Sequence, residues 1–230
     1  MDASVISIGT LSANDLWDER KGVRTGHATT TLIRDEDRLI LVDPGLPPEA
    51  LSARLGERAN LRPEAITDVF ITRFAPDTTR GLGLFDEADW WIAEREREAV
   101  GAPLAMELKR IAEGAADAIG VELKPSLERE ISVLQRTRPA PDRLGSRVAL
   151  FPLPGVSPGL TGLLVEEASR TTLIAGDAVL TGEHLAAGRV AAFAHDVELA
   201  RESFQEAIEI ADVLICGRDN LVINPVKRPF

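Results

Sequence analysis

Cysteine is almost absent from the 230-residue sequence, which contains only Cys216. A single thiol excludes an internal disulfide and a cysteine-rich zinc module. Long apolar runs are missing as well, so we expect no membrane-spanning helix. The first ten residues, MDASVISIGT, lack the basic start and the apolar core of a secretory signal. We therefore expect a cytoplasmic protein without a membrane partner.

Positive charge is also scarce. The 26 Lys and Arg residues are outnumbered by 37 Asp and Glu residues, which gives a net charge of −11. Proteins that bind nucleic acid through its phosphates carry a basic face, so we expect no nucleic-acid partner. A small molecule or an anion is left open as a ligand, and a homodimer is left open as an assembly.

Linker-like segments are missing too, because no Gly/Ser-rich or low-complexity stretch divides the chain. The hydrophobic fraction of 44% and the charged fraction of 27% are ordinary for a folded protein. A chain of this length forms one large domain or two small ones. We therefore expect a single domain over residues 1–230.

Short β-rich segments alternate with helical ones along the chain. The β-branched and apolar runs predict strands at 28–33, 38–43, 68–72, 89–93, 148–153, 162–166, 171–176 and 212–216. The remaining patterns predict helices at 49–58, behind a Pro-Pro pair, and at 196–211, behind Asp196 as N-cap. Strands with helices between them indicate an α/β arrangement.

The segment over about 94–143 differs from its surroundings, because Ala, Leu, Glu and Arg dominate most of it. This composition predicts a helical insert within the domain. The alternating charges of Glu94–Glu98 are typical of a solvated helix face. Two roles stay open for the insert: a lid that narrows a pocket, or a surface that joins two copies of the chain.

Two aspartates end strands in similar contexts, Asp43 in LILVDPG and Asp177 in TLIAGDA. Side chains at the carboxyl ends of strands gather at active sites in α/β folds. Aspartate is also common as a cap of turns and helices. The pattern alone therefore leaves a functional and a structural role open for both residues.

Four segments, taken in order, resemble one family. They are RLILVDPG, DVFITRFAPDTTRGLGLF, LFPLPGVSPGLTGLLVEE with TLIAGDAVL, and ADVLICGRDN. Their order and spacing are similar to those of the metallo-β-lactamase superfamily, from about Thr29 to Asn220 apart from the insert. Within it, the chain resembles the small proteins related to metallo-β-lactamase domain-containing protein 1. The resemblance implies an α/β fold: a four-layer αββα sandwich of two related halves with a helical insert.

Members of this family typically hold two metal ions, usually zinc, which activate water to hydrolyse esters, thioesters, amides or phosphodiesters. Their ligands form a His-x-His-x-Asp-His signature, followed later by a histidine, an aspartate and a final histidine. The resemblance places these ligands at positions 73, 75, 77, 78, 156, 177 and 218 of this chain. Two aspartates are retained there, and all five histidines are replaced: the residues are Arg73, Ala75, Asp77, Thr78, Val156, Asp177 and Arg218.

These replacements remove most of the metal ligands. Arginine stays protonated and has no lone pair for a metal, and alanine and valine have no donor atom. A zinc site needs three or four protein ligands, and only Asp77 and Asp177 are left as residual metal candidates. We therefore expect no cofactor and name no catalytic residue.

The same positions predict a degenerate pocket, formed by Arg73, Asp77, Thr78, Val156, Asp177 and Arg218. Two carboxylates without a metal between them would repel each other. Guanidinium groups pair with carboxylates in a bidentate manner, so we expect Arg73 or Arg218 to pair with Asp77 or Asp177. Such pairs either hold the pocket shut or, together with Arg80, leave a site for an anion.

Two functions remain open. The first is a non-catalytic binding, regulatory or scaffold protein. The alternative is an atypical hydrolase of esters, thioesters or phosphodiesters. It would use one metal on Asp77 and Asp177, a site rebuilt around side chains such as His27, His184 or His195, or no metal. A nuclease, implied by the subgroup resemblance alone, is disfavoured by the net charge of −11.

Two further residues receive structural interpretations. We expect Cys216 to be a buried core thiol, because no base stands beside it to activate a nucleophile. We expect Asp43 to bind backbone amides in the turn that follows its strand.

Overall fold

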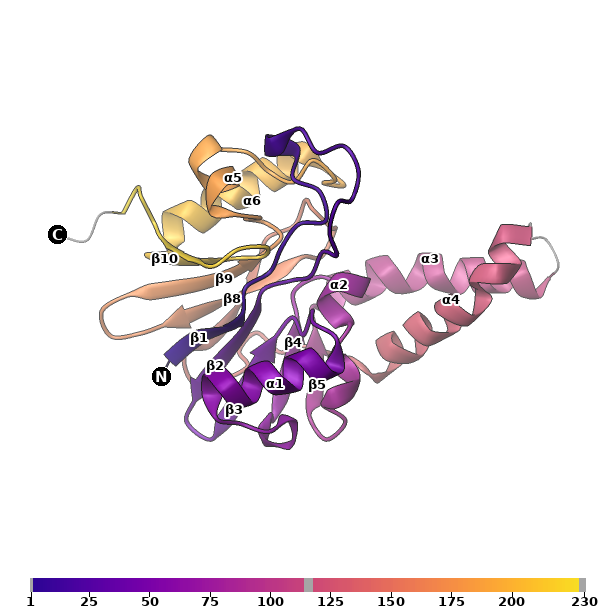
Figure 1. Cartoon of the computed structure of the whole chain (residues 1–230), viewed down its shortest axis with the longest axis horizontal. Helices are drawn as coiled ribbons and strands as arrows, with labels where there is room; N and C mark the ends of the chain where they lie inside the picture. Colours follow the sequence, from indigo (N-terminus) through magenta and orange to yellow (C-terminus); the bar gives the residue numbers. More distant parts are fainter. Residues whose placement is uncertain (1, 114–117, 228–230) are drawn as a thin grey trace.

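Two β-sheets pack face to face between outer helices in a four-layer αββα sandwich (Figure 1). The computed structural model of the protein describes residues 2–113 and 118–227. The first sheet contains, in spatial order, β1 (Asp2–Ser7), β2 (Thr30–Asp35), β3 (Arg38–Val42), β4 (Asp68–Ile71), β5 (Asp89–Ile92) and β6 (Arg138–Pro139). The second contains β11 (Leu221–Ile223), β10 (Val213–Cys216), β9 (Thr171–Gly176), β8 (Thr161–Glu166) and β7 (Val148–Pro152). The implied fold class is confirmed.

Each sheet combines antiparallel and parallel pairs. The predicted hairpin of β2 and β3 is antiparallel, and its turn contains Glu36 in the left-handed region at φ 54°. Strands β3, β4 and β5 run parallel, as do β9 and β10 in the other sheet. The carboxyl ends of parallel strands meet at one edge of a sheet, so the loops after them lie side by side.

The outer helices cover the two sheets through separate apolar clusters. Helix α1 (Pro48–Ala59) buries Leu51 and Leu55 against the first sheet. Helix α6 (Val197–Ile210) buries Ala200, Phe204 and Ala207 against the second sheet, behind Asp196, whose side chain accepts from Leu199 N as predicted for an N-cap. The short helices are α2 (Pro76–Thr79) and α5 (Gly182–Ala187), with 3₁₀ turns at Asp15–Trp17, Pro63–Ala65 and Leu82–Leu84.

A third apolar cluster lies between the sheets. It includes Ile40 and Phe70 from the first sheet and Leu163, Ile174 and Ile215 from the second. Alternate side chains of a strand point to opposite faces, so Ile215 faces the other sheet while Cys216 packs against α6. Central strands such as β4 and β10 consequently have near-continuous apolar sequences, which are typical of strands buried on both faces.

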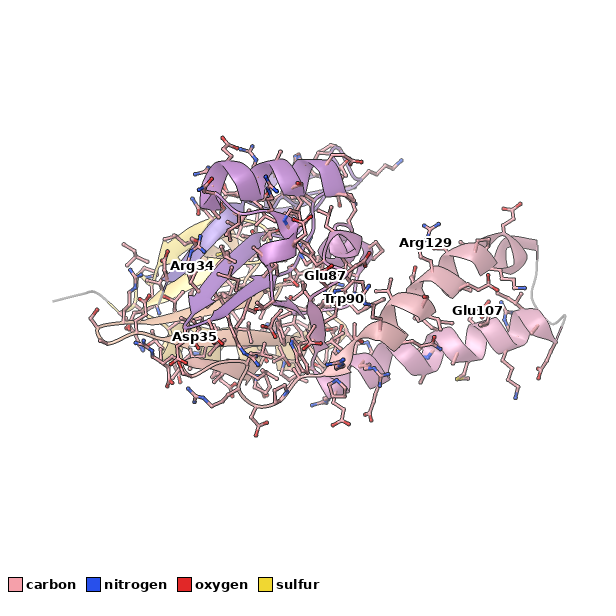
Figure 2. All side chains as sticks on the ribbon, turned by 90° about the horizontal axis from the view of Figure 1, so that it is seen from below. Arg34, Asp35, Glu87, Trp90, Glu107 and Arg129 are labelled. Carbon is pink, nitrogen blue, oxygen red and sulfur yellow. The ribbon has the colours of Figure 1, made fainter. Side chains whose placement is uncertain are left out.

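The insert forms two antiparallel helices that extend away from the sandwich, α3 (Glu94–Ala112) and α4 (Ala118–Arg136) (Figures 1 and 2). Residues 114–117, within the predicted insert, lie outside the described residues. Charged side chains such as Glu107 and Arg129 line the pair along its length (Figure 2). Because only its base meets the sandwich, the pair does not have the position of a lid. No helix in residues 2–113 and 118–227 is both long and apolar enough to cross a bilayer.

Candidate functional site

Four charged side chains converge at the carboxyl ends of strands from both sheets. Arg73 follows β4, and Asp77 lies in the short helix α2 just beyond it. Asp177 follows β9, and Arg218 follows β10. The topology therefore brings Arg73 and Asp77 next to two residues that follow them by 100 positions or more. We call the four residues the Arg–Asp cluster.

Arg218 is the centre of the cluster. Its Nε donates to Asp177 Oδ1 and its Nη2 donates to Asp177 Oδ2, both at 2.7 Å. Its remaining terminal nitrogen, Nη1, donates to Asp77 Oδ2 at 2.6 Å. One guanidinium group thus binds one carboxylate in a bidentate manner and links it to a second carboxylate, a geometry that the ammonium of lysine cannot reproduce.

Arg73 completes the cluster and shares Asp177 with Arg218. Its Nε and Nη2 both donate to Asp177 Oδ2, at 3.0 and 2.7 Å, and Nη2 lies 3.8 Å from Asp77 Oδ1. The predicted pairing of arginine with aspartate is therefore present for both arginines. Two guanidinium and two carboxylate groups cancel each other's charge, so the cluster is neutral.

The cluster has a buried and an exposed half. The side chains of Arg218 and Asp177 are 2% and 3% exposed, whereas those of Arg73 and Asp77 are 17% and 33% exposed. The ring of Phe193, itself 53% exposed, lies 5.7 Å from the Arg73 guanidinium. Solvent therefore reaches the cluster from the side of Arg73, Asp77 and Phe193.

The pairing sets the protonation of the buried half. Burial by itself raises the pKa of Asp177, but the charges and hydrogen bonds of Arg218 and Arg73 outweigh burial and hold this pKa well below its usual range. Burial also opposes the charge of Arg218, and the carboxylates of Asp177 and Asp77 hold its pKa above the usual range. Both groups are therefore ionised over the whole physiological pH range.

Asp43 lies beneath the cluster and has a different role from the one expected. Its carboxylate accepts from the backbone nitrogen of Thr72 at 2.9 Å and from the Thr72 hydroxyl at 2.6 Å. The carboxylate therefore binds the residue that follows β4, not the turn after its own strand. In that turn the backbone carbonyl of Asp43, not its side chain, accepts from Gly45 N. Complete burial raises the pKa of Asp43 to about 7, against the opposing effect of the Thr72 hydrogen bonds.

Thr78 and Val156 belong to the predicted pocket by position, but their side chains do not join the cluster. The Thr78 hydroxyl accepts from Ala75 N at 3.1 Å and donates to the carbonyl of Arg73 at 2.7 Å, so it holds the loop's backbone. Val156 is buried in the apolar cluster under α6. Arg80 is directed to the carbonyl of Gly26, at 3.5 Å.

Glu96 is a residue whose role the sequence did not indicate. The alternating charges around it are typical of a solvated face, but Glu96 is fully buried, so that interpretation is wrong at this position. Its carboxylate accepts from Phe74 N at 2.9 Å, Ser157 Oγ at 2.7 Å and Gly159 N at 3.1 Å. The base of the insert therefore holds two loops, one of which carries Arg73.

The three histidines lie at separate places. His184 is buried, with Nδ1 2.8 Å from Thr181 Oγ1 and Nε2 3.0 Å from Asp15 Oδ1. The ring of His27 contacts the carbonyl of Ile8, and His195 is exposed beside α6. In the part of the chain that the structure describes, no three His, Cys, Asp or Glu side chains gather as a metal site requires.

Cys216 lies in the core below the cluster, as expected. Its side chain packs in the apolar cluster under α6 and is not exposed. Burial, together with the charge of Asp219, raises the pKa of the Cys216 thiol to about 12. A thiol with such a pKa is not a nucleophile at neutral pH.

Comparison with known proteins agrees with the architecture. A family model described as the metallo-beta-lactamase superfamily matches residues 23–217. No curated protein sequence matches the chain. Several solved structures share the arrangement of its elements.

Three of these structures illustrate the range of similar proteins. AidC, a dizinc quorum-quenching lactonase, has a TM-score of 0.67 and 19% identity, over 88% of this chain and 76% of that chain. AiiA from B. thuringiensis, a variant with N-decanoyl-L-homoserine at its active site, has a TM-score of 0.62 and 19% identity, over 94% and 92%. A protein from Staphylococcus aureus, described as a "probable metal-dependent hydrolase", has a TM-score of 0.69 and 15% identity, over 96% of this chain and 92% of that chain. At these identities the likeness shows a shared fold.

Proposed function

The chain belongs to the metallo-β-lactamase superfamily, and we propose that it lacks the dinuclear metal site of that superfamily. In this proposal the protein acts as a binding or regulatory protein. The observation that carries the proposal is the Arg–Asp cluster. Arg218 and Arg73 cross-link Asp77 and Asp177 at positions where the family resemblance places metal ligands. The guanidinium groups neutralise the two carboxylates, which metal ions do in the relatives that bind zinc.

The donor set of the cluster does not fit a zinc pair. Zinc is bound through lone pairs, and a site needs three or four protein ligands. Asp177 offers two carboxylate oxygens, both of which already accept hydrogen bonds from arginine. A dication would also approach two guanidinium groups of like charge, so binding would require that both salt bridges break.

We place the binding surface at the exposed half of the cluster. Arg73 and Asp77 present one cation and one anion to solvent, and Phe193 adds an aromatic face beside Arg73. This combination suits a small polar ligand that carries an anionic group. Such a ligand would compete with Asp177 for Arg73 while Arg218 keeps Asp177 neutralised.

Metal content tests the proposal directly. Purified protein is dialysed against trace zinc and analysed by elemental mass spectrometry, and we expect less than about 0.1 zinc ion per chain. A matched variant restores the five histidines: Arg73→His, Ala75→His, Thr78→His, Val156→His and Arg218→His. If this variant folds and gains zinc, the method detects a site of this kind. One or two zinc ions on the unaltered chain would contradict the proposal.

Hydrolysis is the second candidate, supported by the similar structures that are described as lactonases and hydrolases. It would require a single metal on Asp77 and Asp177 or a rebuilt site. The metal-loaded and the metal-free chain are both assayed with a lactone, a thioester and a phosphodiester. Activity that rises with bound metal and is lost in Asp177→Asn would favour the hydrolase over the binding protein.

A further inference from the structure

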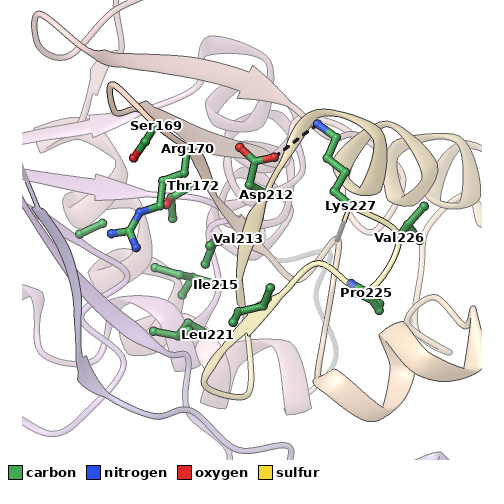
Figure 3. A pocket seen from close by; sticks show the side chains of 12 residues that line it. Ser169, Arg170, Thr172, Asp212, Val213, Ile215, Leu221, Pro225, Val226 and Lys227 are labelled. Atoms are coloured by element: carbon green, nitrogen blue, oxygen red, sulfur yellow. Dashed lines mark ion pairs between the residues drawn. The ribbon is translucent and has the colours of Figure 1, made fainter. Parts of the chain in front are cut away.

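A groove of about 960 Å³ lies at the edge of the sandwich where β1 and β11 are the outermost strands of their sheets (Figure 3). Among its lining residues, Arg170 and Asp212 precede β9 and β10, whereas Asp177 and Arg218 follow these strands. The groove therefore lies toward the opposite end of the second sheet from the Arg–Asp cluster. Its volume is within the range of small-molecule sites.

The floor of the groove is the inner face of the second sheet. Val213 pairs with Ile223, and Ile215 pairs with Leu221, across β10 and β11. Residues two apart on a strand share a face, and Ile215 belongs to the cluster between the sheets. All four side chains therefore face the layer between the sheets, and the groove is the open end of that layer.

The first sheet leaves this end uncovered. It contributes Ala3 from β1, a small side chain, to the groove. Leu221 and Ile223 consequently stay 45% and 63% exposed, and the neighbouring Val226 stays 73% exposed. Exposed aliphatic side chains that gather in this way, instead of lying singly on the surface, form a candidate binding surface.

The shape and chemistry of the groove favour an aliphatic chain. Packed sheets are about 10 Å apart and the space between them is filled by side chains from both inner faces, so an opening in this layer is narrow. Among the described residues that line it, the apolar side chains are all aliphatic, and none of them has an aromatic ring to stack on a planar ligand. Burial of methylene groups against this floor is favourable because it removes apolar surface from water.

Polar groups lie at two sides of the groove. Asp212 and Lys227 face each other across 3.9 Å at one side, and Asp212 also accepts from Thr171 N. The guanidinium of Arg170 lies at the other side, near Thr172 (Figure 3). Arg170 pairs with Glu167 through Nε, and a guanidinium group has four further N–H donors for a second carboxylate.

We propose that this groove binds one single-chain amphiphile, an aliphatic carboxylate of the fatty-acid class. Its hydrocarbon chain lies along Ile215, Leu221 and Ile223 in continuation of the core between the sheets. Its carboxylate binds the Arg170 guanidinium at the rim. The site is independent of the Arg–Asp cluster, so it stands whether or not the cluster binds a ligand.

Isothermal titration with dodecanoate below its micellar concentration tests the site. We expect saturable binding of one dodecanoate per chain. Dodecyltrimethylammonium should bind at least about tenfold more weakly, because Arg170 repels its cationic head. Arg170→Gln is expected to reduce this preference for the anion. Absence of saturable binding, or equal binding of both probes, would overturn the proposal.

Two variants test the position of the hydrocarbon chain. Leu221→Glu places a carboxylate on the floor and is expected to weaken dodecanoate binding at least about tenfold. Ala3→Leu fills the groove from the opposite sheet with an apolar side chain and is expected to block binding while the protein stays folded. Met106→Glu is the matched control, because Met106 is 73% exposed on α3. Binding that survives both Leu221→Glu and Ala3→Leu would place the ligand elsewhere and refute the assignment.

Discussion

Arg218 and Asp177 form a bidentate ion pair in which both N–O distances are 2.7 Å and both side chains are almost fully buried. The pairing stabilises both residues in this position, because a buried charge needs a partner. The pair joins the loop after β10 to the loop after β9. It therefore stabilises the edge of the second sheet at which the candidate functional site lies.

The first prediction concerns this pair. Arg218→Leu leaves Asp177 buried with Arg73 as its remaining cation, so we expect the free energy of unfolding to fall by about 3 kcal/mol. Urea unfolding measures the change. Arg201→Leu is the control, since Arg201 and its partner Glu198 are exposed and such pairs contribute little. Equal losses in the two variants would show that the buried pair contributes no more than a surface pair.

The second prediction concerns pH. The pKa of Asp43 is about 7 in the folded protein, compared with 3.8 for an ordinary aspartate, which we take for the unfolded chain. Between these values the folded state keeps a proton that the unfolded chain has lost, so the free energy of unfolding falls as the pH rises from about 4 to about 7. The lowered pKa of Asp177 acts with the opposite sign, because its contribution is lost as the pH falls below about 4.

Asp43→Asn isolates this effect, because asparagine imitates the protonated carboxyl and does not titrate. Relative to the variant, the unaltered protein should lose about 3 kcal/mol of unfolding free energy between pH 4 and pH 7. Denaturant unfolding at several pH values provides the comparison. Parallel stability curves over this range would mean that Asp43 is ionised in the folded protein.

The third prediction concerns Glu96, which holds two loops at the base of the insert. Glu96→Ala leaves the Phe74 and Gly159 amides and the Ser157 hydroxyl without their acceptor, so we expect a loss of about 3 kcal/mol in unfolding free energy. Hydrogen exchange of the Phe74 and Gly159 amides should accelerate as well. Glu98→Ala, an exposed position on the same helix, should change neither quantity. Unchanged exchange in Glu96→Ala would contradict its positioning role.

The fourth prediction concerns the close approach of two segments beside the site. Gly155 has φ 129°, and a Cβ atom there would overlap the backbone of Ala200 in α6. Gly155→Ala should therefore lower the free energy of unfolding by at least about 2 kcal/mol. Gly56→Ala is the opposite case, since Gly56 lies inside α1 with no atom within 4 Å of the added Cβ. Gly56→Ala should raise the free energy of unfolding by roughly 1 kcal/mol. Thermal unfolding of both variants distinguishes the loss at Gly155 from the gain at Gly56.

The sequence by itself determined the elements and the identity of the cluster. Apolar runs predicted β4, β9 and β10 to within about two residues, because burial on both faces demands continuous apolar sequence. The order of four segments then indicated the αββα fold. Loss of the histidines and retention of Asp77 and Asp177 were enough to predict arginine–aspartate pairing, since like charges cannot share a pocket.

Tertiary structure alone decided the partners of several other side chains. Glu96 has the same local sequence as its exposed neighbours, and only the packing of α3 against two distant loops buries it. Asp43 reaches Thr72 because β3 and β4 are adjacent in the sheet, which no local pattern encodes. The groove beside β1 and β11 likewise depends on where two sheets end relative to each other. Hydrophobic pattern is a local property of the chain, whereas these contacts join residues far apart in sequence, and only the folded chain brings them together.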